Sequence, residues 1–585
     1  MTQPTLVSQF YIKIDGVDAT TAVMNCLYEI EVDTGFQMPG SAVLKFYDQD
    51  LTLTSGTVFD LGKELEISAL SATGTATKTV IFKGPVTNLE PEFVVGSSYS
   101  MYVVRAYDKS FKLHRGTSST SYVQVSDSDI VSTIASEAGL TADVEATSVV
   151  HPHVLRHDQS GYEFLSHLAR RNGYVLYYDS PSSKLLFKKP ATLATTSVSV
   201  TYGETMQEFR PRYALTGQVN EITVSGWDPA QKQAVTGSAN SPTFSPASTE
   251  LGRGPTVATS KFSAAKLHIT ETSSTQALAE SVALSVLNRM AGSDLTAEGV
   301  ALGNPAVKPG VNLRVTHLGK FSGTYLVTRV THRFGQRDAY TMDIWMGGMQ
   351  SGTFASIIND DPRATVQQPA TQHGLLVGIV TNNTDDEGDY GRVKVKYPTI
   401  DSKLESFWAP VVSVGAGNKR GLMFLPEVND EVLVGFVNGD INRPYVLGGL
   451  WNGRDAPPQA KSAAVVNGQV EIRELKTRVG HVLRFTDTLG SEKIELIDKS
   501  GNNLLEIDTA QNTVTIKAQK DIVLQATGDI LMKGVNIKLE GSAKVDIKAA
   551  QVQAQADSQI ALKGAMAELS ASGITKVSGS MVNIN

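Results

Sequence analysis

Alternation of polar and apolar residues dominates the first 350 positions. Strands are predicted where β-branched and aromatic residues alternate in part with polar ones, at residues 10–14, 42–47 and 325–330. Helices are predicted where apolar residues recur at helical spacing, in the segments starting near Asp127, Tyr162 and Leu278. This pattern indicates a group of α+β domains over residues 1–350, with more strand than helix. Residues 237–261, rich in Ser, Thr, Pro and Gly, are interpreted as a long surface loop.

A compact β-barrel is predicted for residues 372–458. Residues 392–397 alternate polar and apolar, residues 431–437 do so in part, and Asn438-Gly439-Asp440 forms a turn signal. About five strands in about 75 residues suit a small closed barrel of the OB-fold size. The polar, Pro-containing stretch 351–371 is interpreted as a linker between the α+β domains and the barrel.

The C-terminal segment, 459–585, carries apolar residues in alternating pairs spaced about eight residues apart. We predict that these pairs form the core of an oligomeric shaft: Val514, Ile516, Ile522, Leu524, Ile530, Met532, Ile537, Leu539, Val545, Ile547, Ile560 and Leu562. Alternate residues of a strand face one side, and a single-chain solenoid coil needs about 20 residues or more. We therefore predict an intertwined homotrimeric β-helix (β-prism), with one short strand per repeat starting at Ile472.

Composition supports this division of the chain. After Pro458 there is no Pro, Trp or Tyr and a single Phe, which argues against an ordinary globular core. The absence of Pro keeps strand ladders intact. A net charge of −7 disfavours a nucleic-acid partner, no apolar run is long enough to span a membrane, and no secretory signal is visible at the first residues. A single cysteine, Cys26, excludes a disulfide framework and is interpreted as a small buried residue.

Candidate chemistry is sparse. His151, His153 and His157 could bind a metal, but Pro152 interrupts them and no carboxylate shares their face, so a surface loop is favoured. The acidic run 385–389 could bind calcium, but it lacks the spacing of a calcium loop, so a barrel turn is favoured. No nucleophile motif is present, and the stretch between Pro458 and Val470 is too short for a lysozyme-like domain. We expect no enzyme activity, no cofactor and no metal.

Several ordered sequence blocks are similar to a known family. In the barrel these are DYGRVKV at 389–395, WAP at 408–410, GLMFLPEVNDEVLVGF at 421–436, NGD at 438–440 and RPYVLG at 443–448. Upstream, YDKSFKLHRG at 107–116 and QSGYEFL at 159–165 agree. The chain resembles the hub-spike proteins of the VgrG and tailed-phage family over nearly its whole length. Residues 31–33 (EVD) and Met38-Pro39 look closest to spikes of extracellular contractile injection systems.

The resemblance implies a function. A homotrimer would be the central hub-spike of a contractile injection baseplate, with a hub (1–350) docked on the inner tube, an OB-fold collar, and a membrane-puncturing shaft. The implied partners are tube, tube-initiator and baseplate proteins, effector cargo, and a PAAR-type tip protein. The target membrane would be contacted only on firing. The protein would be made in the bacterial cytoplasm and assembled into a phage-tail-like particle, which in an extracellular system leaves the cell.

The final strand-like residues are the predicted binding site of that tip protein: Ser580, Met581, Val582, Asn583, Ile584 and Asn585. An uncovered strand edge there would be prone to further pairing. The alternative is a tail-associated adhesin or glycan-binding stalk. It is disfavoured because the segment has no aromatic residue, the type of side chain enriched at binding surfaces.

Overall fold

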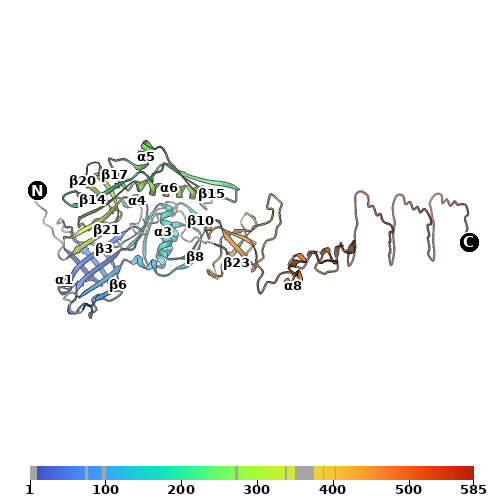
Figure 1. Cartoon of the computed structure of the whole chain (residues 1–585), viewed down its shortest axis with the longest axis horizontal. Coiled ribbons are helices and arrows are strands. Elements are labelled where there is room, and N and C mark those ends of the chain that lie inside the picture. Colours follow the sequence, from blue (N-terminus) through green and yellow to red (C-terminus); the bar gives the residue numbers. More distant parts are fainter. Residues whose placement is uncertain are drawn as a thin grey trace. The chain divides into compact units, whose positions relative to one another are not determined.

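The computed structural model describes residues 9–72, 77–94, 100–270, 275–335, 339–348, 374–386, 388–401 and 404–584. The predicted linker 351–371 and Asn585 therefore lie outside the described residues. The chain divides into two compact units, Met1–Ala456 and Pro457–Asn585, which are described separately. Figure 1 shows strands as the dominant elements of the first unit.

The first core is built by N-terminal strands. Its elements are β1 (Phe10–Ile14), β2 (Val17–Asp18), α1 (Thr21–Cys26), β3 (Leu27–Gly35), β4 (Ser41–Tyr47), β5 (Glu64–Ala69), β6 (Thr79–Glu92) and β7 (Met101–Tyr107). In β4 buried and half-buried residues alternate, as expected for a strand with one face on a core. Cys26 is partly buried against this core. The predicted strands at 10–14 and 42–47 are confirmed.

A second group of strands continues the same sheet. It comprises β13 (Ser197–Thr201), β14 (Met206–Tyr213), β17 (Ala247–Thr249), β19 (Leu295–Leu302), β20 (Asn312–Thr316), η2 (Gly319–Phe321), β21 (Gly323–Gly335) and β22 (Thr341–Met346). The main path of the 14-stranded sheet runs β14-β19-β22-β21-β3-β4-β7-β6-β5-β1-β2. The two groups join where β21 pairs antiparallel with β3. Here Arg329 donates to both carboxylate oxygens of Asp33, at 2.9 and 2.7 Å, and its guanidinium lies over the Trp345 ring.

A helical domain lies between these two groups in the sequence. It comprises η1 (Lys109–His114), β8 (Ser118–Ser126), α2 (Asp127–Glu137), β9 (Thr141–Val144), β10 (Val150–Gln159), α3 (Gly161–Asn172), β11 (Val175–Asp179), β12 (Lys184–Lys188) and α4 (Pro190–Leu193). Both longer helices begin with a capping box, Ser126 with Asp129 and Ser160 with Glu163, which satisfies the first free N–H groups. The block QSGYEFL is therefore a helix start, and the helices predicted near Asp127 and Tyr162 are confirmed.

The remaining part of this region is a three-stranded sheet covered by a helix. Its elements are β15 (Glu221–Asp228), β16 (Gln233–Ala239), α5 (Gly254–Phe262), β18 (Lys266–Thr270) and α6 (Gln276–Gly292). The helix predicted near Leu278 is confirmed as α6. The interpretation of residues 237–261 as one surface loop is wrong. The segment includes the end of β16, all of β17 and most of α5. The helix forms despite the polar composition because proline is favourable in the first turn of a helix, where Pro255 lies.

The predicted barrel is a five-stranded sheet in the order β25-β24-β23-β26-β27. Its elements are β23 (Leu376–Asn382), β24 (Arg392–Lys396), β25 (Ala409–Pro410), β26 (Glu431–Phe436), η3 (Val437–Gly439) and β27 (Pro444–Gly449). The core contains Val380, Val393, Val395, Val432 and Val434, all fully buried. The described residues of the acidic run, 385–386 and 388–389, lie in the turn between β23 and β24, where Asp386 accepts from Arg392 Nε at 2.6 Å.

The second unit starts with short elements and continues as an antiparallel meander. It comprises α8 (Lys461–Ala464), β28 (Val465–Val466), β29 (Gln469–Val470), β30 (Ile472–Lys476), β31 (Val482–Thr486), β32 (Lys493–Ile497), β33 (Leu504–Asp508) and β34 (Thr513–Lys517). Strands β30–β34 pair sequentially within one chain. The predicted eight-residue repeat starting at Ile472 is therefore wrong up to Lys517, because five-residue strands joined by turns pair with their sequence neighbours there.

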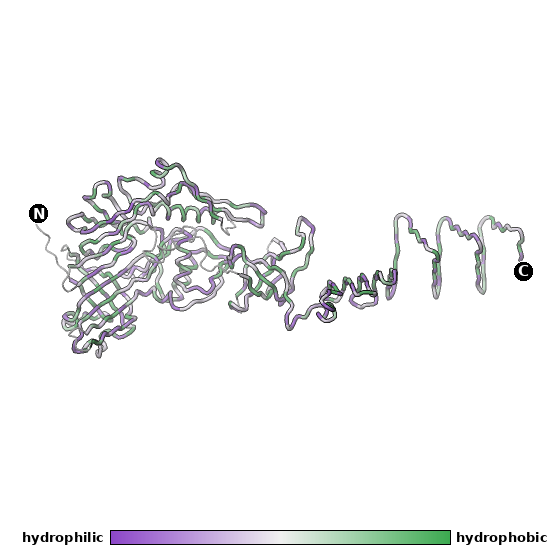
Figure 2. The backbone as a smooth tube through the Cα atoms, viewed as in Figure 1, coloured by the Kyte–Doolittle hydropathy of each residue, from purple (hydrophilic) through white to green (hydrophobic). Residues whose placement is uncertain are grey.

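Beyond β34 the backbone is extended but unpaired. Residues 520–584 contain no hydrogen-bonded strand and no backbone hydrogen bond within the described part of the chain. Figure 1 draws this part as a bare trace that repeatedly reverses direction. Figure 2 shows hydrophilic and hydrophobic residues alternating along it. The strand predicted at the C-terminal segment 581–584 is likewise absent from the single chain.

Candidate functional site

The histidine cluster is part of the folded hub and not a surface loop. His151, His153 and His157 lie on strand β10, and His151 is 7% exposed. The loop interpretation is wrong because residues 150–159 form a strand, in which His151 Nε2 lies 3.1 Å from Oδ1 of Asp127, a residue distant in sequence. Within the described residues no group of three His, Cys, Asp or Glu side chains could hold a metal ion. No helix in that same part of the chain has the length and apolar character needed to cross a membrane.

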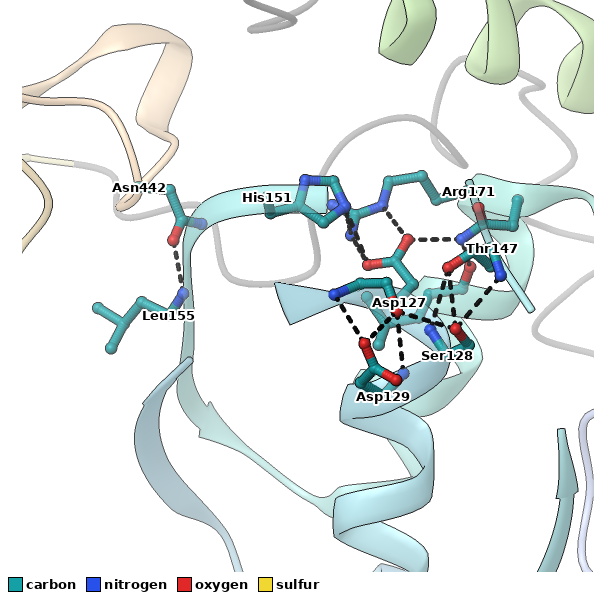
Figure 3. A network of polar contacts seen from close by, with 11 residues as sticks. Asp127, Ser128, Asp129, Thr147, His151, Leu155, Arg171 and Asn442 are labelled. Atoms are coloured by element: carbon teal, nitrogen blue, oxygen red, sulfur yellow. Dashed lines mark hydrogen bonds and ion pairs between the residues drawn. The ribbon is translucent and has the colours of Figure 1, made fainter. Parts of the chain in front are cut away.

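Asp127 is the centre of a buried polar network at the start of α2 (Figure 3). Its carboxylate accepts from Arg171 Nε at 3.1 Å and from Asn172 Nδ2 at 2.6 Å, both at the end of α3. Burial raises the pKa of Asp127, but Arg171 and His151 outweigh it and hold that pKa well below its usual range. The Asp127 carboxylate therefore stays ionised at neutral pH, and its contacts join α2, β10 and α3.

The barrel is attached to the hub through the edge of β10. The backbone N–H of Leu155 donates to Asn442 Oδ1 at 2.6 Å, as Figure 3 shows. The ring of His153 stacks on Phe407 with centroids 6.1 Å apart, and its Nε2 lies 3.2 Å from the carbonyl oxygen of Glu405. Burial lowers the pKa of His153 to about 4, so the neutral ring donates through Nε2 at pH 7. At this hub–barrel junction the barrel satisfies a backbone N–H group on the edge of β10 that would otherwise lack an acceptor from a neighbouring strand.

The two faces of the meander β30–β34 differ, because one carries a central row of charged side chains and the other a row of apolar ones. On the polar face Arg484 pairs with Glu474 at 2.7 Å, and Lys493 pairs with Glu506 at 3.0 Å. The strand register places a continuous apolar set on the opposite face: Leu475, Leu483, Phe485, Ile494, Leu496, Leu505, Ile507, Val514 and Ile516. Most of these side chains are exposed in the single chain, and Leu496 is 56% exposed. A sheet with one uncovered apolar face lacks half of its core.

The extended tail has a 15-residue repeat with two bends in each copy. Single-residue bends lie at Val535, Ala550, Ala565 and Ser580, and two-residue bends start at Thr527, Ser542, Asp557 and Ser572. The four copies are residues 521–535, 536–550, 551–565 and 566–580. Bends therefore alternate at steps of seven and eight residues, so the predicted eight-residue period is half of a longer unit. A Gly or Ala directly precedes each of these four single-residue bends: Gly534, Ala549, Gly564 and Gly579.

Ten of the twelve predicted core residues occupy equivalent places in this repeat, whereas Val514 and Ile516 lie on β34. In each pair two residues share one face, with a bend before and after the pair. The twelve predicted side chains are between 52% and 80% exposed in one chain, so a single chain does not bring them together into a core. The predicted tip-binding residues 580–584 are exposed too, and Asn585 lies outside the described residues.

The apolar face of the meander was missed by sequence reasoning, apart from Val514 and Ile516. A signal was available, because Leu483 and Phe485, then Ile494 and Leu496, then Leu505 and Ile507 are pairs at spacing two, each at the centre of a five-residue strand. Their spacing of 11 residues differs from the later period, and turns around Gly490 and Gly501 separate them. The meander and the tail thus share the same feature, apolar pairs at spacing two, and differ only in the distance between successive pairs.

Comparison with known proteins decides the family. The family described as "Alg8 N-terminal domain" matches residues 5–336, more than half of the chain. The chain belongs to the Alg8 N-terminal domain family. The Alg8-type region is followed by a match to "Type VI secretion system/phage-baseplate injector OB domain" at residues 376–451. The predicted OB-fold identity of the barrel is thereby confirmed.

Curated relatives of this Alg8-type chain are VgrG proteins, which confirms the predicted family resemblance. The chain is 26% identical over 197 residues to "Type VI secretion system spike protein VgrG3" of Vibrio cholerae, covering 32% of this chain and 19% of the relative. It is 25% identical over 197 residues to "Actin cross-linking toxin VgrG1" of the same species, covering 32% of this chain and 18% of the relative. The matches span about a fifth of these relatives.

A solved structure has the same overall fold. The Francisella PdpA–VgrG complex, in its half-lidded form, aligns with a TM-score of 0.50 at 9% identity, and the alignment covers 88% of both chains. At this identity the likeness concerns the fold alone. The mainly β architecture with α+β hub domains and an OB barrel is therefore that of a VgrG-type protein.

Proposed function

We propose that this chain is the central hub-spike of a contractile injection baseplate. Three copies would form the spike, the hub would cap the inner tube, the OB barrel would act as a collar, and the C-terminal shaft would puncture the target envelope. The family, and a relative named as a spike protein, support this assignment. The adhesin alternative is not favoured by these relatives. An origin in an extracellular particle stays a prediction.

One observation carries the proposal. Apolar rows begin on the meander and continue through four 15-residue repeats, yet no other part of the described chain covers them. Unpaired backbone groups and exposed apolar side chains occur along the same segment, so one partner must satisfy both requirements. Strands of further copies wound around the same axis do so, because each supplies ladder hydrogen bonds and an apolar face.

The shaft must transmit force without bending, and its sequence suits that task. The segment after Pro458 has no proline, so every residue can donate to a strand ladder. Outward positions alternate with the apolar pairs and carry mixed charges such as Lys538 and Glu540. Such a surface keeps the assembled shaft soluble and limits edge-to-edge aggregation.

The further partners are also part of the proposal. A PAAR-type tip protein would bind residues 580–585, tube and tube-initiator proteins would contact the hub, and effector cargo would associate with the particle. Deletion of residues 580–585 should abolish pull-down of the tip protein while the shaft still assembles. Unchanged capture of the tip protein by this truncation would contradict the assigned site.

We also propose that the chain has no catalytic role. Because one similar relative is named an actin cross-linking toxin, activity assays need to include both peptidoglycan cleavage and actin cross-linking. We expect neither with the purified chain. Activity that an Asp or Glu substitution removes would contradict the proposal.

Light scattering of the purified full chain tests the assembly. A trimer is expected at three times the chain mass of 62.7 kDa. Electron micrographs of particles assembled with a tagged chain should place the tag on the central axis of the baseplate. A soluble monomer with a protease-resistant tail, or a tag at the particle periphery, would contradict the proposal.

A further inference from the structure

The OB barrel carries an ordered hairpin that we name the barrel arm, residues 412–426 between β25 and β26. Both ends of the arm are fixed to the barrel. Val412 N donates to Val446 O at 2.8 Å, and Asn383 Nδ2 donates to Pro426 O at 3.1 Å. Inside the arm, Gly417 N donates to Arg420 O at 2.9 Å. The arm is therefore a defined structure and not a loose loop.

The two legs of the arm approach closely and present apolar side chains outward. A side chain at Gly421 would place its Cβ 2.7 Å from the carbonyl oxygen of Gly415, so only glycine fits between the legs. Five apolar side chains of the arm are 49–79% exposed: Val412, Val414, Leu422, Met423 and Phe424. So much contiguous apolar surface on a short hairpin marks an interaction site.

The barrel also has an apolar patch around Gly435. Leu375 and Leu447 flank this glycine, since a Cβ at Gly435 would lie 3.3 Å from Leu375 Cδ2 and 3.4 Å from Leu447 Cδ1. Both leucines are exposed, by 53% and 43%, and Val377 on β23 is 38% exposed. The glycine leaves the floor of this patch without a side chain. We name it the Gly435 patch.

We propose that the barrel arm of one copy packs on the Gly435 patch of the next copy, so that three arm-to-patch contacts close a ring of barrels. This inference rests on the proposed trimer. Each contact joins two different surfaces, and such a head-to-tail contact closes into a ring when the rotation is threefold. Both surfaces are exposed in the single chain, as the contact requires.

Two arguments favour a copy of this chain as the occupant. Trimerisation through the shaft brings the three covalently attached barrels to a high effective concentration, which favours even a small contact. The arm carries no charged residue besides Lys419 and Arg420 at its tip, and the exposed side chains of the Gly435 patch are Leu375, Val377 and Leu447. Both surfaces are therefore mainly apolar, and burying one against the other is favourable.

Cysteine cross-linking of the full chain tests the contact. In a Cys26→Ser background, Phe424→Cys is combined with Leu447→Cys and treated with a short bismaleimide. Because every chain then carries both halves of the contact, a closed ring gives a covalent trimer on a denaturing gel. An isologous contact of the arm with itself would stop at covalent dimers. Each single-cysteine variant should lose the trimer band.

A matched control and a second variant separate the outcomes. Phe424→Cys with Thr399→Cys, an exposed residue in the turn after β24, should give no covalent trimer. Replacing Met423 with Asp in the double-cysteine protein should abolish the trimer band, while light scattering of the untreated protein still reports three copies.

The result also distinguishes this inference from the proposed function. A trimer by light scattering that yields only cross-links within one chain, or none, overturns the arm contact and leaves the trimeric spike standing. Capture of a different baseplate protein by the Phe424 cysteine, without interchain links between copies, also overturns it. A monomer by light scattering overturns both proposals.

Discussion

Replacement of Leu524 by Asp is the most direct perturbation of the proposed shaft. Leu524 is the second residue of an apolar pair with Ile522, and its side chain is 66% exposed in the single chain. In a trimer the three copies would meet on the inner face of the shaft. The neighbouring Val523 is 79% exposed and points to the opposite face, so Val523→Asp is a matched control.

The magnitude follows from burial and charge. Full burial of a leucine stabilises by about 1.5–3 kcal/mol, so covering two thirds of its surface gives roughly 1–2 kcal/mol per copy. Each carboxylate placed on the inner face costs several kcal/mol more. Three copies lose on the order of 10 kcal/mol or more, which is comparable with the total stability of a typical domain. Val523→Asp places its charge in water and should change little.

The assay is urea-induced dissociation followed by light scattering. The unmodified protein and Val523→Asp should dissociate at the same urea concentration. Leu524→Asp should dissociate at a much lower concentration or be a monomer of 62.7 kDa from the outset. Protease cleavage should also increase around residues 518–530 in that variant only. Equal damage from both substitutions would refute the assignment of inner and outer faces.

Further predictions concern the repeat, the junction and the hub core. Deleting Lys538 alone should destabilise the trimer because it reverses the faces of the following residues, whereas deleting the whole repeat 536–550 should preserve assembly by light scattering. Burial lowers the pKa of His153 to about 4, below its unfolded value of about 6.5, so the folded state binds fewer protons between these values. Contact between the hub and barrel should therefore weaken as pH falls from 6.5 to 4, measured as faster amide exchange at Leu155, and His153→Gln should flatten that dependence. Gly303→Ala should lower the melting temperature sharply, because its Cβ would lie 2.1 Å from the buried Tyr340 ring; an unchanged melting temperature would contradict the packing.

Local patterns were sufficient for most individual elements. The strands at 10–14 and 42–47 and the three helices follow from side-chain periodicity and caps, which act over a few residues. The barrel follows from alternation together with ordered blocks such as RPYVLG. Residues 237–261 were misread because a polar segment can still start a helix at Pro255 and can pair β17 with distant β21.

The candidate sites divide in the same way. The apolar pairs of the tail were found from sequence because a repeated spacing is visible without knowing any contact. The environment of His151 could not be found, since its partner Asp127 is 24 residues away and reaches it only after α2 and β10 pack together. The barrel arm and the Gly435 patch also required the structure, because exposure depends on what the rest of the chain leaves uncovered.

By itself, the sequence determined the β-barrel, the spacing of the apolar pairs in the tail, and the family resemblance. These properties depend on periodicity and composition, which can be read from the order of the residues without knowing which residues are in contact. Tertiary structure alone decided that residues 472–517 form a meander within one chain and that β10 contacts the barrel. Strand pairing and burial depend on which distant segments meet. Several segments can offer hydrogen-bond partners to the same strand, and the local residue pattern does not determine which of them pairs with it.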